Sequence, residues 1–272
     1  MALSPVASAN SALLTSIQGN QALVDRYQQR LVAGRAVSSA LDNAPAFALA
    51  QGLTQRAETL GQVGAQVGQG IGALQAAQTG IDAIGKVVGQ LKSLAQLAQA
   101  SSDPNVQTQL ATQYNALAGQ IDTIVGDASY GGVNLIKASP DTLTVSGPGQ
   151  TLSTSVSGQA ADSVSLGITP AGAWSTSSAT IAADIAKLDQ ASQSLGRASS
   201  SLGSNTANLQ TVAAYATAQA QTASSGAAKL TTADQAEAAA SAQAAQTYRQ
   251  LGLNALRNQV HSQDSVLALF SR

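Results

Sequence analysis

The sequence lacks cysteine altogether and has only one histidine and one tryptophan in 272 residues. Without cysteine there is no disulfide framework, no thiolate metal site and no cysteine nucleophile. The single histidine, His261, cannot supply the histidine pair of a zinc protease. Its spacing of three residues to Asp264 predicts a solvated or interface pair rather than a catalytic dyad. The sequence therefore predicts no catalytic residue, no metal site and no cofactor.

Charge is also scarce. Charged residues make up 10% of the chain, whereas soluble proteins average about 25%. The net charge is −1, and lysine and arginine are spread singly, so no basic face predicts a nucleic-acid partner. No apolar run approaches the roughly 18 residues of a membrane span. Residues 1–20 lack the basic region and apolar core of a cleaved signal peptide, so we expect any export to follow a route without one.

What the sequence does contain is apolar residues spaced by three and four. Two interleaved heptad rows run through the first 31 residues, Leu3, Asn10, Ile17, Val24 and Leu31 with Val6, Leu13, Asn20 and Tyr27. The last twenty residues carry a similar row, Leu253, Leu256, Val260, Gln263, Leu267 and Phe270. Such rows are typical of a helix that packs along another helix. We expect the two ends to pair with each other or with copies of themselves.

The middle of the chain predicts longer helices. A clean heptad predicts a helix from about residue 46 to 101, with rows at Leu60, Val67, Leu74, Ile81, Val88 and Ala95 and at Val63, Gly70, Ala77, Ile84, Leu91 and Ala98. Residues 102–104 predict a capped turn into a returning helix that ends at Gly126. A helix from Thr180 would use the rows Ile181, Leu188, Leu195, Leu202 and Leu209 and Ile185, Ser192, Ser199 and Thr206. Residues 224–226 predict a break, and a last helix would begin near Thr232.

Between the long helices the pattern changes to alternation. Residues 142–145 and 151–156 alternate around a Gly–Pro–Gly turn, which predicts a β-hairpin. The lone Trp174 is expected to plug a small local core, and Asp184 with Lys187 to form an ion pair on a helix face. The predicted fold is mainly α with a small β-hairpin insert at about residues 137–178, and its long coiled-coil-like helices bring N- and C-terminal segments together.

Three segments resemble bacterial flagellins. Residues 30–44 (RLVAGRAVSSALDNA) resemble the flagellin stretch R-L-S-S-G-x-R-I-N-S-A-K-D-D-A, with Asn43 and the following Pro45 departing from the usual Asp and Ala. Residues 121–124 and 130–136 resemble E-I-D-R-I and F-N-G-x-x-L-L, and residues 253–272 resemble the flagellin C-terminus. The resemblance spans nearly the whole chain apart from about residues 137–178. The insert is short, so the large outer domains of longer flagellins are expected to be absent.

The resemblance implies an inner domain from residues 1–33 and 232–272. It also implies a middle domain from residues 34–179, which hold the β insert, and the long helix of residues 180–231. It implies a secreted structural subunit that polymerises into the extracellular flagellar filament used for swimming, exported through the flagellar type III channel. Implied partners are copies of itself, hook-associated junction and cap proteins and a secretion chaperone. Candidate subunit-interface residues are Leu3, Val6, Leu13, Ile17, Val24, Tyr27, Arg30, Leu31, Gly34, Arg35, Asp42, Asn43, Leu253, Leu256, Val260, Leu267 and Phe270.

Three alternatives remain at this point. A hook–filament junction protein has similar helical ends but often a larger, more β-rich insert. A cytoplasmic coiled-coil binding protein would form soluble dimers and would not be secreted. An enzyme is the weakest alternative, because only His261 could serve it.

Overall fold

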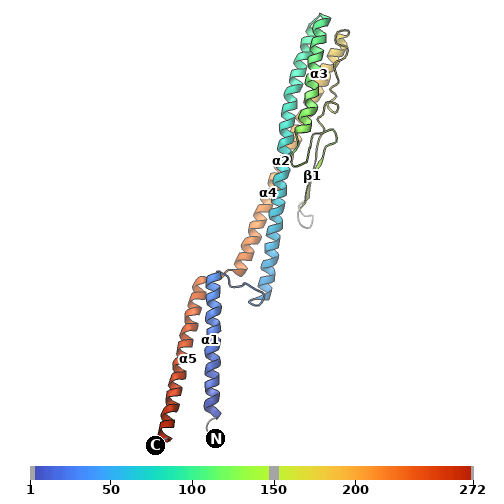
Figure 1. Cartoon of the computed structure of the whole chain (residues 1–272). Coiled ribbons are helices and arrows are strands. Elements are labelled where there is room, and N and C mark those ends of the chain that lie inside the picture. Colours follow the sequence, from blue (N-terminus) through green and yellow to red (C-terminus); the bar gives the residue numbers. More distant parts are fainter. Residues whose placement is uncertain (1–3, 147–152, 271–272) are drawn as a thin grey trace. The chain divides into compact units, whose positions relative to one another are not determined.

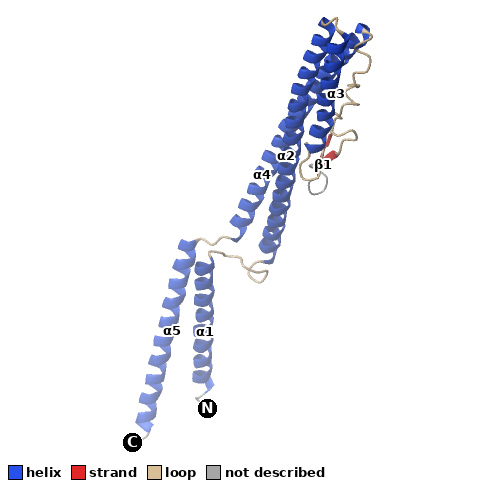
Figure 2. Cartoon of the chain, turned by 45° about the horizontal axis from the view of Figure 1, so that its top comes forward, coloured by secondary structure: helices blue, strands red, loops and turns tan. Residues whose placement is uncertain are grey.

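The computed structural model describes residues 4–146 and 153–270, and of residues 4–9, 263 and 266–270 only the backbone. Figures 1 and 2 show long helices and one small sheet. In chain order the elements are α1 (Ser4–Ala33), α2 (Ala44–Ala100), α3 (Pro104–Asp127), β1 (Thr142–Ser146), β2 (Ser153–Ser157), α4 (Ser178–Thr231) and α5 (Gln235–Phe270). The predicted mainly α fold with a small β-hairpin is confirmed.

The chain divides into two compact units. The terminal unit holds residues 1–55 and 223–272, and the middle unit holds residues 56–222. The division passes through α2 and α4, so each of these helices contributes to both units.

The core of the middle unit lies along α2. All twelve predicted heptad positions of α2, from Leu60 to Ala98, are buried, which confirms the two rows. On α4 the leucine row is buried as predicted. Of the predicted second row, Ile185, Ser199 and Thr206 are only half-buried and Ser192 is exposed. Asp184, Ala191 and Ala198 are buried there, one residue before the predicted Ile185, Ser192 and Ser199. Residues three or four positions after a member of the leucine row lie near that row on a helix with 3.6 residues per turn. The row of Asp184, Ala191 and Ala198, at a spacing of three, buries no serine hydroxyl.

Polar contacts fix α2 against α4. Lys92 Nζ lies 2.5 Å from Asp189 Oδ1, and Gln78 Nε2 donates to Ser199 Oγ at 2.7 Å. Position 80 must be small, because a Cβ on Gly80 would lie 2.8 Å from Ala128 Cβ and from Ile136 Cδ1. These contacts hold the glycine-rich helix against its neighbours.

The hairpin pairs β1 with β2 in antiparallel register, with Val145 opposite Thr154. Val145 and Val156 point into the core, and their neighbours along each strand are exposed or half-buried. The predicted turn at residues 147–149 lies outside the described residues.

An irregular strap, residues 158–177, covers the helices of the middle unit. Asn115 exchanges two hydrogen bonds with the Ala171 backbone, donating at 3.2 Å and accepting at 2.7 Å. Asp122 accepts from the N–H and the hydroxyl of Ser163. Trp174 is buried and donates from Nε1 to Asp184 Oδ2 at 2.8 Å. The predicted Asp184–Lys187 pair exists at 3.3 Å, but Asp184 is buried rather than on the helix surface.

Burial raises the pKa of Tyr114 to about 12, and the charge of Asp184 adds to the effect. Because the folded protein holds this phenol protonated, its contribution to stability is complete below pH 10 and is lost as the pH rises towards 12. We expect one of the five tyrosines to ionise last in an absorbance titration at alkaline pH. Tyr114→Phe should remove that late step, and an unchanged titration curve would contradict the assignment.

One predicted helix break is wrong. α4 continues through residues 224–226 to Thr231, and the chain instead leaves the helix at Thr232 to Asp234. The helix tolerates Gly226 because the missing side chain makes room for Leu53, whose Cδ1 would lie 3.2 Å from a Cβ placed there. The last helix begins at Gln235, where Asp234 Oδ1 accepts the N–H groups of Ala236 and Glu237 and acts as its N-cap.

Candidate subunit interface

In the terminal unit, α1 and α5 lie side by side and antiparallel (Figure 1). Seven of the heptad positions predicted on α1 are buried or half-buried, and we call them the α1 seam: Asn10, Leu13, Ile17, Asn20, Val24, Tyr27 and Leu31. Gln21 and Arg30, which lie outside the heptad, are also half-buried. Val24 is the most buried of them at 3% exposure. Leu3 lies outside the described residues, and so does the side chain of Val6.

The facing row of α5 differs from the predicted one. Its members are Ala238, Ala242, Ala245, Arg249, Gly252, Leu256 and Gln259. Of the predicted residues whose side chains the structure describes, only Leu256 belongs to it, while Leu253 and Val260 are 39% and 44% exposed. The side chains of Leu267 and Phe270 lie outside the described residues.

Gly252 sets which face of α5 packs against α1. A Cβ on Gly252 would lie 2.9 Å from Ile17 Cγ1, so Ile17 packs against α5 at a position that must have no side chain. Next to this contact Arg249 Nη1 donates to Gln21 Oε1, and Gln21 Nε2 donates to Asp25 Oδ1 at 2.9 Å. A sequence pattern that counts only apolar residues assigns no packing role to Gly252, and so it places Leu253 and Val260 in the row.

The loop between α1 and α2 is joined by backbone hydrogen bonds to the connection between α4 and α5. Gly34 ends α1 with a positive φ of 64°, a conformation that glycine adopts without steric cost. Ala36 N–H then donates to Thr231 O at 2.7 Å, and Ala233 N–H donates to Gly34 O at 3.1 Å. Arg35 pairs with Thr232 in a short antiparallel bridge. The start of α5 is thereby fixed beside the end of α1.

Asp42 and Asn43 shape the connection into α2. The N–H groups of Ser38 and Ser39 donate to Asp42 Oδ2, each at 3.0 Å. These backbone hydrogen bonds hold the pKa of Asp42 below its usual value of 3.8, and the hydroxyl of Ser39 and the charge of Arg30 act in the same direction. Asn43 Oδ1 accepts from Ala46 N–H at 3.1 Å, so the asparagine serves as the N-cap of α2. Both residues therefore order the loop.

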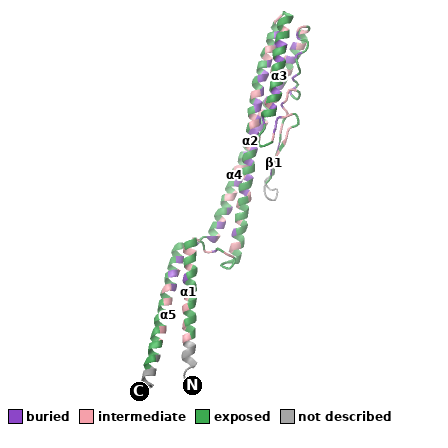
Figure 3. Ribbon diagram, viewed as in Figure 1, coloured by how far each residue is buried: buried purple, intermediate pink, exposed green. Residues whose placement is uncertain are grey.

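The terminal unit has little core of its own (Figure 3). Apart from Val24 and Val37, its buried apolar residues are alanines. Fourteen large apolar side chains are exposed among the described residues, and nine of them belong to this unit. They are Leu14, Leu23, Val32, Leu41, Leu49, Tyr248, Leu251, Leu253 and Val260. These nine side chains are available for contact with a partner.

The exposed residues flank the α1 seam on both sides. At about 100° of rotation per residue, Leu14 and Val32 project from one side of α1 and Leu23 from the other. On α5 the same geometry places Tyr248 and Leu251 on one side of its buried row, and Leu253 and Val260 on the other. The helix pair therefore offers two apolar edges. Of these residues the sequence singles out only Leu253 and Val260, because single apolar residues outside a heptad carry no periodic signal.

Two further features are absent from the described part of the chain. No group of three or more His, Cys, Asp or Glu side chains there could hold a metal ion. Among the described helices, none has the length and hydropathy needed to cross a membrane.

The chain is similar in sequence to known flagellins. The family model for the bacterial flagellin N-terminal helical region matches residues 6–140. Flagellin FljK of Caulobacter vibrioides is 26% identical over 261 residues, which cover 94% of each chain. Flagellin FljM of the same organism is 26% identical over 276 residues, 99% of this chain and all of FljM. The crystal structure of Bacillus cereus flagellin matches with a TM-score of 0.48 at 18% identity, over 55% of this chain and 86% of that one.

Proposed function

The chain belongs to the bacterial flagellin family, and from this membership we propose that it polymerises with copies of itself into a filament that serves swimming motility. Flagellins are structural subunits of the flagellar filament. Because FljK and FljM match over 94% and 100% of their own lengths, a filament subunit is favoured over a junction protein with a larger insert.

The observation that carries the proposal is the incomplete core of the terminal unit. Its helices bury alanines against each other and leave nine large apolar side chains in water. Burial of one such side chain is worth about 1.5–3 kcal/mol, so several of them buried between neighbouring copies would supply stability that one chain lacks. Edges that differ from each other favour a head-to-tail contact, which builds open helical filaments rather than closed dimers.

The candidate interface residues divide into two roles under this proposal. Val24, Ile17 and Leu256 join α1 to α5 within one chain and so build the inner domain proposed for residues 1–33 and 232–272. Leu253 and Val260 are free to contact the next copy. Residues 34–231 would form the surrounding middle domain.

The proposal also places the protein outside the cell. Export through the flagellar type III channel would suit an N-terminal helix that buries little until it meets its neighbours. Junction proteins, a cap protein and a secretion chaperone are the further partners proposed from the family.

Seeded growth tests the proposal. Purified chain added to short fragments of its own filaments should elongate them, as measured by sedimentation and electron microscopy. Removal of residues 1–33 or 235–272 should abolish elongation, because each deletion takes away one partner of the α1–α5 pair. Circular dichroism of each deletion variant serves as the control, since the core of the middle unit lies entirely within residues 60–216. Full-length chain that fails to elongate seeds, or deletion variants that elongate them normally, would contradict the proposal.

A further inference from the structure

The loop after α1 presents one leucine entirely to solvent. Leu41 is 98% exposed, although the turn that carries it is well braced. Asp42 N–H donates to Ser39 O at 3.2 Å, and Asp42 Oδ2 accepts from Ser39 Oγ at the same distance. Leu41 is therefore an apolar knob on an ordered turn, and the chain itself provides no surface that covers it.

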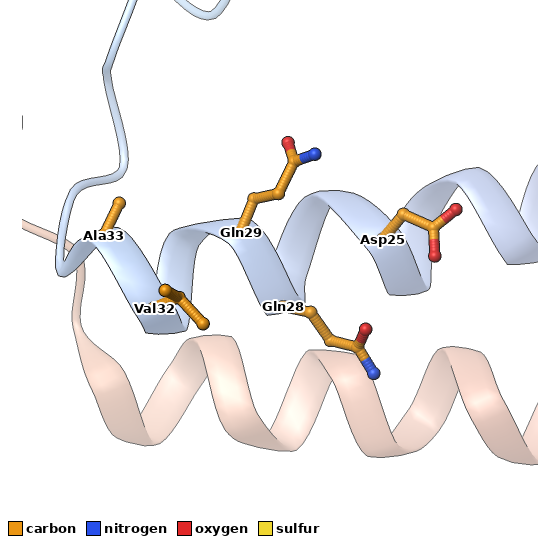
Figure 4. Close-up of a pocket in the computed structure, with 5 residues that line it drawn as sticks. All are labelled: Asp25, Gln28, Gln29, Val32 and Ala33. Atoms are coloured by element: carbon orange, nitrogen blue, oxygen red, sulfur yellow. The ribbon is translucent and has the colours of Figure 1, made fainter.

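A matching hole lies on α1. Asp25, Gln28, Gln29, Val32 and Ala33 line a shallow concavity of about 520 Å³, and all five belong to this helix (Figure 4). The first four are spaced 0, 3, 4 and 7 along the chain, which is the four-residue diamond that receives a knob in coiled-coil packing. Val32 is 90% exposed, so the chain does not fill the hole itself.

Charge favours the same match. Arg35 lies on the loop that carries Leu41, and Asp25 lies at one end of the hole. Among the ion pairs of the described residues neither has an oppositely charged partner. Asp42, the other charge on the loop, already accepts three hydrogen bonds from Ser38 and Ser39. Docking would therefore bring an unpaired cation towards an unpaired carboxylate.

We propose that Leu41 of one copy inserts into the Asp25–Gln28–Gln29–Val32 hole of a neighbouring copy. The occupant of the hole is a second copy, because every chain carries both Leu41 and the hole, and within one chain Leu41 does not fill it. A knob that fits a hole elsewhere on the same molecule makes a contact that repeats without closing. The inference rests on the proposed function and names one of its contacts.

Cross-linking between single-cysteine variants tests the contact, since the natural chain has no cysteine. Leu41→Cys and Gln28→Cys, one of them carrying a size tag, are mixed into an excess of unmodified chain, which keeps filaments forming. A short bis-maleimide should then give a tagged–untagged dimer in filaments and none in dilute monomer. The matched control pairs Gln28→Cys with Val164→Cys. Val164, like Leu41, is a strongly exposed apolar residue, at 81%, but it lies in the middle unit.

A second measurement guards against chance proximity. Leu41→Asp should raise the critical concentration for growth about tenfold or more, the factor expected when one leucine is no longer buried. Leu41→Met should stay near the natural value. Filaments that form but give no more Leu41–Gln28 dimer than the control, or that take up Leu41→Asp as readily as Leu41→Met, would overturn the inference and leave the proposed function intact. Failure of the unmodified chain to form filaments would overturn both.

Discussion

Val24→Asp is expected to abolish incorporation of the chain into filaments. Val24 is the most buried residue of the α1 seam at 3% exposure, and the α5 residues that face the seam in this part of the pair are mainly alanines. A carboxylate there would lose the burial of valine, and Arg249, the one cation of the facing row, already donates to Gln21. An uncompensated buried charge costs about 3–5 kcal/mol, so α1 and α5 should separate rather than bury it. Sedimentation after seeded growth should find the variant in the supernatant.

Ala22→Asp is the matched control, because it places the same charge two residues away on the exposed side of α1. This variant should still sediment with the seeds. Circular dichroism should show a partial loss of helix in Val24→Asp, because the middle unit has its own core and should stay folded. Equal incorporation of both variants would show that pairing of α1 with α5 is not required for growth.

Trp174→Ala is expected to lower the free energy of unfolding of the middle unit more than any other single truncation in the strap. Trp174 is 1% exposed, and its ring lies 4.9 Å from that of Tyr114 in an edge-on arrangement. Removal of a buried tryptophan costs about 3–5 kcal/mol. The change also takes a hydrogen-bond donor from buried Asp184, which adds about 1–3 kcal/mol. Denaturant unfolding followed by circular dichroism measures the loss.

Trp174→Phe separates the two contributions. Phenylalanine keeps most of the ring packing on Tyr114 but donates no hydrogen bond to Asp184, so its cost should be the smaller part, about 1–3 kcal/mol. If Trp174→Ala unfolds at the same denaturant concentration as the natural chain, the strap is not held by this residue and the assignment fails.

The helices were predictable because each has a period. Every heptad position predicted on α2 is buried, since a helix packed along others must present the same stripe over its whole length. The turn at Asp103 was equally clear: its side chain accepts Asn105 N–H at 2.8 Å and proline follows it. The strap was less visible. Its anchors, Asn115, Asp122 and Asp184, are polar side chains whose partners lie 10 to 56 residues away, and no local pattern marks such pairs.

The candidate interface also has one part that local sequence patterns predict and another that depends on contacts between distant residues. The sequence alone determined the α1 seam, the length of α2 and the cap at Asp103, because local geometry and the spacing of apolar residues fix them. Only the tertiary structure decided which face of α5 meets α1, since the choice depends on how closely Ile17 approaches Gly252. It alone also decided that Leu41 and Val32 remain in water, because exposure depends on what the rest of the fold leaves uncovered.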